Sequence, residues 1–461
     1  MDPRTGLAAY GPYGTGLPEE PRQIRVGIVG TQESIEKVLK LMEEISQPIE
    51  QDANIDCVLH PSFPGLNIQG PFQVHLVTQS QWHRRLHKRD FRPLEECGDP
   101  NTRRWLVQEA FGGEVRSLSE LENPPQVILC ALAEPFSMFS RVESDKDNSD
   151  RSLLQDALCN GRERSSRNAN RLFRAGLKAE CMEAVLTELI GDPGYFKTKG
   201  AEDRPTQAWK LSLALLHKAG LVPWRLANPS KDACLVGISI YRASGRTSSP
   251  GLKSFAHVVT ESGNGFVVDG DAFERDVNGD KDNATHLDEE QARRLLFRAM
   301  DVFEKQTGVS PRKVAVYKRT PYSEGERRGF EDILANIPEY GLMTIASRGI
   351  VCMRPGRKPI LRGMALAFDE KLGLVFTSGY VPFLRGYSGN KIPEPLEITE
   401  NWGSMSFQRA AEDLIRLTKL DLSSPDFCTD FPITFARAQA MADVFLSLGR
   451  REPSLDDRYY I

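Results

Sequence analysis

The sequence predicts an α/β fold made of two layered units. Across residues 23–205, short apolar runs alternate with helical segments, which is the pattern of a layered α/β domain. From residue 206 onward, three β-rich segments follow one another and then give way to alternating helices and strands. The chain has 461 residues, 40% of them hydrophobic and 26% charged, which is enough material for two packed cores.

The first unit begins with an alternating, β-branched run that predicts a strand, and a helical pattern follows it. The first 22 residues are rich in Gly, Pro and Tyr and lack the apolar stretch of a signal peptide, so we expect a flexible tail. The expected elements are strands at 23–30, 72–78 and 126–132 and helices at 34–46 and 162–189.

The second unit is expected to begin at residue 206. Three consecutive strands followed by alternating helix and strand is the order of an RNase H-like sheet, whose first strand is Val236–Tyr241. The expected strands are 233–242, 253–262, 265–269, 313–320, 342–347 and 374–381, and the expected helices are 208–219, 288–306, 324–335, 406–417 and 435–448.

Composition excludes some classes of protein. The formal net charge is −4, so the whole chain is not a polycation, although local clusters of Lys and Arg can still bind nucleic acid. The eight cysteines are scattered without CxxC or zinc-ligand spacing, which is typical of free thiols in the cytoplasm. Since the sequence contains no run of about 18 apolar residues, we expect no contact with a membrane.

A stripe of cations is the strongest local signal. Arg167, Arg171, Arg174 and Lys178 are spaced to share one face of a helix. Like charges on one stripe destabilise an isolated helix, and an anionic partner offsets that cost. The stripe therefore predicts phosphate binding; the alternative is a solvated face, which usually mixes both signs of charge. The basic run 81–92, with interleaved aromatics, predicts either nucleic-acid contact or a solvated helix face.

The acidic segment 269–283 contains glycine and invites comparison with a calcium-binding loop. Its glycine has the wrong offset and the terminal Glu is missing, so a polar hairpin loop is the preferred interpretation. The seven histidines form no recognisable metal motif.

Several segments, in this order along the chain, resemble short prokaryotic Argonautes. The resemblance runs from about residue 165 to the end and implies a Rossmann-like MID domain (23–205) and an RNase H-like PIWI domain (206–461), without N and PAZ domains. The matching segments are Lys218-Ala219-Gly220 with Pro223-Trp224, the strand Val236–Tyr241, Thr377–Pro382, Pro393–Leu396 and Pro432–Ala436.

The resemblance implies that the nuclease site is degenerate. Ser239, Thr320 and Thr434 stand where the family places metal-binding side chains, and the glutamate finger has no clear counterpart. Two-metal cleavage needs clustered carboxylates, which hydroxyl groups cannot replace. We therefore expect no catalysis by this chain. The alternative is a stand-alone guided endonuclease with displaced carboxylates, for example Glu261 or Asp269.

The resemblance also implies a pocket for the 5′-phosphate of a guide strand. Its residues correspond to Arg174, Lys178, Glu188 and Lys218, so two of them coincide with the cation stripe. Arg174 replaces a Tyr that stacks on the first base, and Glu188 replaces a Gln, which places a negative charge near the phosphate. The terminal carboxylate, here of Ile461, is expected to help hold Mg²⁺ with the guide phosphate. Arg167 and Arg171 are expected to contact the guide backbone.

Short Argonautes act with a partner, and the resemblance implies one here. The expected ligands are a guide RNA and a complementary single-stranded DNA. The expected partner carries an APAZ domain fused to an effector, with a Sir2-like NADase preferred over a TIR-like module or a nuclease. Together they are expected to defend a cell against plasmids or phage. A third hypothesis is an RNase H-like scaffold that binds no nucleic acid.

Overall fold

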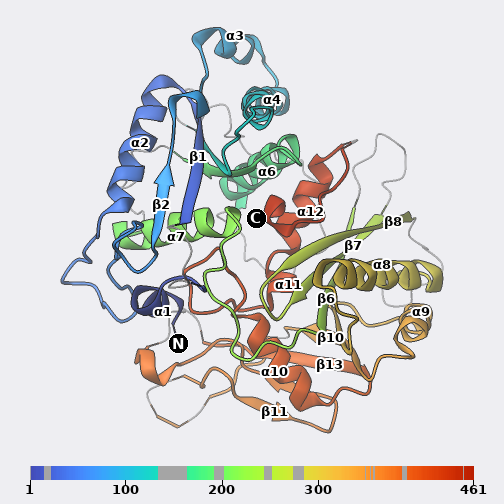
Figure 1. The fold of residues 1–461 in the computed structure, drawn as a ribbon. Coiled ribbons are helices and arrows are strands. Elements are labelled where there is room, and N and C mark those ends of the chain that lie inside the picture. Colours follow the sequence, from blue (N-terminus) through green and yellow to red (C-terminus); the bar gives the residue numbers. More distant parts are fainter. Residues whose placement is uncertain are drawn as a thin grey trace.

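The computed structural model contains two β-sheets with helices on both faces, joined along a seam of packed helices (Figure 1). This confirms the predicted α/β fold class. The structure describes residues 2–14, 22–132, 164–191, 202–242, 252–273, 285–347, 349–353, 355–356, 359–386, 392–449 and 451–461.

The first sheet is parallel throughout, in the order β2-β1-β4-β5, with β3 also paired to β1. Helices α2 and α7 cover one face, and α4 and α6 cover the other. The strands are β1 (Arg22–Gly30), β2 (Val74–Val77), β3 (His83–Arg85), β4 (Val127–Ala131) and β5 (Leu186–Ile190), and the helices are α2 (Gln32–Ser46), α3 (Lys88–Glu96), α4 (Pro100–Ser119), α6 (Arg164–Glu180) and α7 (Arg204–Lys218).

The second sheet has eight strands in the order β11-β12-β13-β10-β9-β6-β7-β8. Its first three strands form an antiparallel meander, and β9 then returns parallel to β6, as the RNase H-like order predicts. The strands are β6 (Ala233–Arg242), β7 (Leu252–Thr260), β8 (Gly265–Phe273), β9 (Lys313–Lys318), β10 (Glu339–Ala346), β11 (Ala365–Ala367), β12 (Gly373–Val375) and β13 (Leu396–Gly403).

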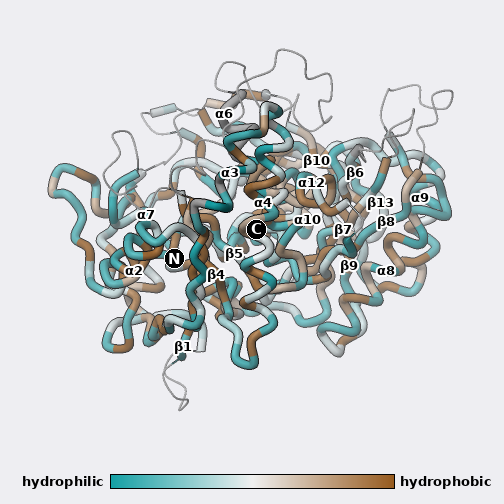
Figure 2. Tube along the Cα trace, turned by 90° about the horizontal axis from the view of Figure 1, so that it is seen from above, coloured by the Kyte–Doolittle hydropathy of each residue, from teal (hydrophilic) through white to brown (hydrophobic). Residues whose placement is uncertain are grey.

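Each face of the second sheet has its own helical layer. Helices α8 and α9 cover one face, and α10, α11 and α12 cover the other. In Figure 2, hydrophobic stretches lie along the central strands of both sheets. The helices are α8 (Glu289–Thr307), α9 (Glu324–Leu334), α10 (Phe407–Leu417), α11 (Ile433–Ala436) and α12 (Ala438–Ser447), followed by the short 3₁₀ turn η4 (Asp457–Tyr460).

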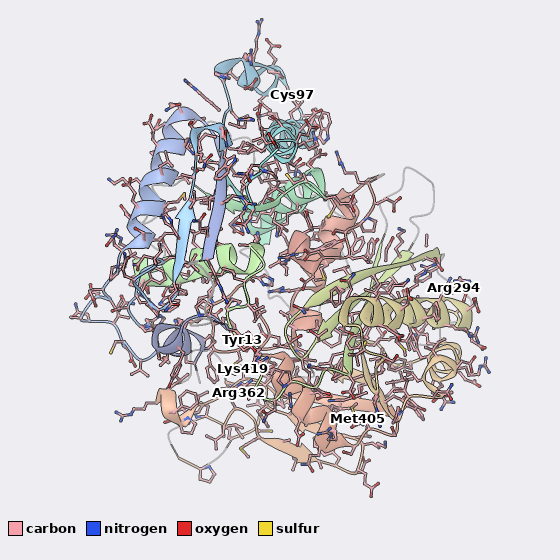
Figure 3. The ribbon with its side chains drawn as sticks, viewed as in Figure 1. Tyr13, Cys97, Arg294, Arg362, Met405 and Lys419 are labelled. Atoms are coloured by element: carbon pink, nitrogen blue, oxygen red, sulfur yellow. The ribbon has the colours of Figure 1, made fainter. Side chains whose placement is uncertain are left out.

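The expected flexible tail is wrong for residues 3–10, which form helix α1 (Pro3–Tyr10). The Asp2 side chain caps the helix by accepting from the amides of Arg4 and Thr5, and Leu7 is buried in the core of the first sheet. The guanidinium of Arg225 lies 3.8 Å from the ring centroid of Tyr13, in the region that Figure 3 labels with Tyr13 and Lys419. An N-cap Asp followed by Pro was a helix signal that the high Gly and Pro content obscured.

Three further expectations need correction. Helix α7 packs its apolar face, including the buried Trp209, into the core of the first sheet, so the division between the units falls after α7 rather than at residue 205. The predicted helix 162–189 ends at Glu180, and its last residues form β5, because they pair with the buried β4. The basic run 81–92 is not one helix: it contains a 3₁₀ turn, β3 and the start of α3.

The seam between the two units is built by α6 and α12, which lie side by side. The apolar side chains of Ala175, Ala179 and Met182 are buried in one cluster with Met441 and Phe445 of α12. Phe173 and Leu177 on another side of α6 pack with α4 and β4 in the core of the first sheet. Arg174 and Lys178 lie between these two contacts, near Glu188 of β5.

Helix α11 approaches β6 so closely that only glycine fits at position 237. A Cβ added to Gly237 would lie 2.5 Å from the Cβ of Thr434 and 2.9 Å from its carbonyl oxygen. The Thr434 side chain is fully buried at this contact. The strand and the helix therefore fix each other's position beside the predicted nuclease site.

We predict that Gly237→Ala lowers the free energy of unfolding by about 1–3 kcal/mol, because the added methyl group forces α11 away from β6. Chemical denaturation monitored by circular dichroism measures this change. Gly113→Ala is the matched control, since a Cβ at Gly113 meets no atom within 4 Å. Equal stability of the Gly237 variant and the wild type would contradict the close approach.

Candidate functional site

The four predicted pocket residues come together from three elements of the first unit. Lys218 ends α7 and is buried, and its Nζ donates to Glu188 Oε2 and to the carbonyl oxygen of Thr187, each at 2.5 Å. Glu188 lies on β5, the strand that the sequence had suggested to be helical. Arg174 and Lys178 lie one turn apart on α6 and are close enough to both partners to act on their charges.

The electrostatics of this cluster favour an anion. Burial works against the charge on Glu188, but Lys218, Lys178 and Arg174 together hold the pKa of its carboxyl below the usual range. Burial and then the neighbouring Lys218 lower the pKa of the Lys178 ammonium well below its usual value. The cations outnumber the single carboxylate, and burial together with Lys218 disfavours the charged form of Lys178. A phosphate group at this position would compensate the excess of positive charge and stabilise the charged form of Lys178.

A cation from the second unit also belongs to the site, and sequence reasoning missed it. Arg437 precedes α12 and is buried, with Nη2 donating to Asp421 Oδ1 at 2.6 Å. It lies near enough to Lys178 to lower the pKa of that ammonium further. The signal was available, because Arg437 directly follows the matching segment Pro432–Ala436. The site therefore lies between the two units rather than within one.

The end of the chain lies beside this cluster. The turn η4 contacts both β5 and α6, and the C mark in Figure 1 lies between α6, α7 and α12. Tyr460 is fully buried and its hydroxyl donates to the carbonyl of Ser454 at 2.9 Å, which fixes the turn. Ile461, the last residue of the sequence, is held next to the predicted pocket, and its role as an ion ligand stays a prediction.

Arg171 of the stripe does not join the cluster. Arg171 Nε lies 2.7 Å from Asp443 Oδ2 of α12, so its charge is compensated across the seam. The expected contact of Arg171 with a guide backbone would have to compete with this ion pair. The side chain of Arg167 lies outside the described residues, and its role stays a prediction.

The predicted nuclease positions gather at one edge of the second sheet. Ser239 lies near the end of β6 and is buried, while Thr320 follows the end of the adjacent β9. Thr434 on α11 is fully buried against β6, and its hydroxyl has no hydrogen-bond partner among the described residues. Ser239 and Thr320 lie toward the carboxyl ends of two neighbouring parallel strands, where α/β sheets place their ligands, while Thr434 packs from α11 on Gly237 of β6.

The two acids considered as displaced ligands lie at different distances from this edge. Glu261 follows Thr260, which pairs with Cys234 at the start of β6, so it lies roughly 20 Å from Ser239. It is also held by Arg416 at 2.5 Å. Asp269 lies level with Ser239, two strands away, at roughly 10 Å, and Lys253 Nζ lies 2.9 Å from its Oδ2.

No protein-family model and no curated protein matches this sequence. Solved structures do. Clostridium butyricum Argonaute bound to a guide DNA and a 19-mer target DNA has a TM-score of 0.58 at 11% identity, covering 96% of this chain and 50% of that one. A. aeolicus Argonaute has a TM-score of 0.55 at 14% identity, covering 99% and 52%. The same Argonaute with externally bound siRNA gives 0.53 at 14% identity, covering 100% and 53%.

The chain has an Argonaute-like fold. It spans about half the length of the Argonautes that it matches. At identities of 11–14%, sequence comparison fails while the strand order and helix packing remain recognisable. We use the names MID and PIWI for the two units from this point.

The Argonaute-like MID site does not build a cation site from its own side chains. Glu188 is the carboxylate of the cluster, and Lys218 already occupies it. Among the described residues there is no group of three His, Cys, Asp or Glu side chains suited to a metal ion. The expected Mg²⁺ would depend on the guide phosphate and the Ile461 carboxylate.

Most of the acidic segment 269–283 lies outside the described residues. None of the described helices is long and apolar enough to cross a membrane.

Two buried histidines line the MID–PIWI seam next to the pocket. Burial, and then the nearby Arg437, lower the pKa of His217 to about 4. His217 Nε2 has no hydrogen-bond partner in the part of the chain that the structure describes. His257 Nε2 lies 3.2 Å from Asp457 Oδ2. Although burial opposes it, the His257 hydrogen bond and charge, and then Arg437, lower the pKa of Asp457 to about 2.

We predict that acid destabilises the fold through His217. The unfolded chain protonates this histidine below its ordinary pKa of 6.5, whereas the folded chain does so only near pH 4. The free energy of unfolding therefore falls as the pH drops through this window, by up to about 3 kcal/mol. In His217→Gln, the loss between pH 7 and pH 5 should be smaller than in the wild type. Denaturant midpoints at the two pH values measure this, and equal losses would contradict it.

Proposed function

We propose that this chain binds a short guide strand by its 5′ end and uses it to recognise complementary single-stranded nucleic acid. The observation that carries the proposal is the convergence of Arg174, Lys178 and Lys218 on one site, with Arg437 reaching it from PIWI. A guide RNA and a DNA target follow from the family resemblance. Solved relatives in fold bind guide DNA with target DNA, or siRNA.

Each side chain has a distinct task in this proposal. Lys178 and Arg174 supply charge to the guide phosphate, because neither forms an ion pair with a carboxylate of the described residues. Lys218 holds Glu188 and so removes most of the repulsion that this carboxylate would exert. Protein contacts fall on the phosphate and backbone, and base pairing supplies the sequence specificity.

We predict opposite effects for two variants of this site. Lys178→Ala should weaken binding of a 5′-phosphorylated guide by about tenfold or more, since it removes a charge-assisted phosphate contact. Glu188→Gln should strengthen the same binding by about threefold to tenfold, because it removes a competing anion while its amide oxygen still accepts from Lys218. Fluorescence anisotropy with a labelled guide measures both.

The controls separate the 5′ phosphate from the rest of the guide. Lys305→Ala is the matched surface control, since Lys305 is 71% exposed on α8 and pairs only with Asp301 in the described structure. A guide with a 5′-hydroxyl should respond much less to both pocket variants. If both guides lose affinity equally in Lys178→Ala, the lysine contacts the backbone or supports the fold, and the pocket assignment is wrong.

The proposal extends to a sensor role without cleavage. Ser239, Thr320 and Thr434 supply hydroxyls where two-metal chemistry needs carboxylates. We propose that recognition of the target is passed to a partner with an APAZ domain, which carries a Sir2-like NADase in preference to a TIR-like module or a nuclease. The pair then acts against plasmids or phage. This step is supported by the family resemblance and by the absence of clustered carboxylates among the described residues.

We predict that the complex of this chain with the product of its neighbouring gene consumes NAD⁺ only when both guide and complementary target are present. The reason is that, in this proposal, this chain recognises the target through the guide, whereas the partner carries the active site that consumes NAD⁺. A time course of NAD⁺ concentration, with guide alone and with a mismatched target as controls, tests the dependence. Consumption of NAD⁺ without guide or target would contradict the sensor role.

The stand-alone nuclease remains the second candidate, because Asp269 lies level with Ser239 on the same sheet. The same incubations, analysed on a denaturing gel, decide between the two. Target cut at one defined position by the purified, guide-loaded chain with Mg²⁺ or Mn²⁺ would establish the nuclease. An intact target, together with NAD⁺ loss in the complex, supports the sensor.

A further inference from the structure

The degenerate edge of the PIWI sheet carries a cation of its own. In the pairing of β6 with β9, the last partners are Gly237 and Tyr317, and β9 ends at Lys318. Continuing this register past the end of β9 places Arg319 level with Ser239. Side chains alternate along a strand, so these two residues share the face of Gly237 and Tyr317. That face packs on α11: Gly237 touches Thr434, and the ring of Tyr317 lies 6.5 Å from that of Phe435.

The surroundings of Arg319 leave its charge uncompensated. Its guanidinium lies 5.2 Å from the ring centroid of Phe431, just before α11, and the side chain is half-buried. Burial lowers the pKa of Arg319, and no carboxylate of the described residues pairs with it. The preceding residue differs, since Lys318 is bound to Glu326 on the other face of the sheet. Asp269, which the strand register places level with Ser239, forms an ion pair with Lys253.

The chemistry of this edge is the reverse of a two-metal site. In a two-metal site, carboxylates hold cations, and the cations hold the phosphodiester. Here the cation is covalently part of the chain, and the neighbouring groups are neutral hydroxyls. A guanidinium binds a phosphodiester directly, and its fork of donors matches two phosphate oxygens. It does not lower the pKa of a bound water as a metal does, so it binds without activating a nucleophile.

We propose that Arg319, with the Ser239 hydroxyl beside it, forms a subsite that holds one backbone phosphate of the paired target strand without a divalent ion. This inference rests on the proposed function, because the target reaches the edge only when it is paired with a bound guide. The loss of carboxylates at positions 239 and 320 is then a change of ligand chemistry. It converts a metal site into an anion site.

The test compares target binding by guide-loaded wild type, Arg319→Gln and Arg319→Lys. Arg319→Gln should raise the target Kd about tenfold and lower the slope of log Kd against log salt by about 1, as expected for one lost phosphate contact. Arg319→Lys should restore the slope and part of the affinity. EDTA should leave the contribution of Arg319 unchanged. Arg328→Gln is the matched control, because Arg328 is 56% exposed on α9, on the other face of the sheet.

A second variant reverses the charge balance at the same place. Ser239→Asp puts a carboxylate next to Arg319 and should weaken target binding in the absence of divalent ions to a similar extent. A target with one neutral methylphosphonate linkage locates the contact. When the neutral linkage lies opposite Arg319, the wild type should lose the tenfold advantage that it holds over Arg319→Gln.

The outcomes separate this inference from the proposed function. Failure of the wild type to bind guide or target overturns the proposed function. Normal guide and target binding by the wild type, with unchanged target Kd and salt slope in Arg319→Gln, overturns the subsite alone. Arg319→Gln could also lose thermal stability and guide binding by enough to explain its weaker target binding. That result would show that Arg319 only supports Phe431 and α11, and it would also overturn the proposed subsite.

Discussion

The packing of α6 against α12 is the constraint on which the rest of this structure depends. Burying Ala175 and Ala179 of α6, with Met182 just after it, among the side chains of α12 joins the two units. It also fixes the rotation of α6 about its axis. Because residues one turn apart share a helix face, this rotation places Arg174 and Lys178 together near Glu188 of β5. The ion pair of Arg171 with Asp443 holds the same orientation from the side.

Both proposed binding sites contain a partly buried cation. At the MID site, Arg174, Lys178 and Lys218 surround Glu188, which Lys218 occupies, and Arg437 approaches from the second unit while paired with Asp421 and Asp457. At the PIWI edge, Arg319 stands among neutral side chains, while the adjacent Lys318 is neutralised by Glu326. In both places no carboxylate of the described residues forms an ion pair with one partly buried cation, Lys178 or Arg319, and such an arrangement costs stability unless an anion is bound. Phosphate groups along one strand would satisfy both.

The seam between the units is also where stability and binding are coupled. Gly237 allows α11 to lie against β6, and Arg437, directly after α11, reaches the MID site. The buried His217 lies within reach of the same Arg437, so protonating it adds a charge to a region already rich in cations. A change that separates the units therefore removes one wall of the guide site and displaces the nuclease-like edge.

The sequence by itself determined the layered α/β class, the three consecutive strands, the cation stripe and the hydroxyl residues Ser239, Thr320 and Thr434 at the positions compared with the family's metal ligands. Each of these follows from local periodicity or from a short motif. Tertiary structure alone decided that 186–190 is a strand, because pairing with β4 outweighs a helical pattern, and that α7 belongs to MID, because its apolar face fits that core. It alone brought Arg437 to Lys178 and Ser239 level with Arg319, since contacts between distant segments depend on packing and strand register, which no local pattern encodes.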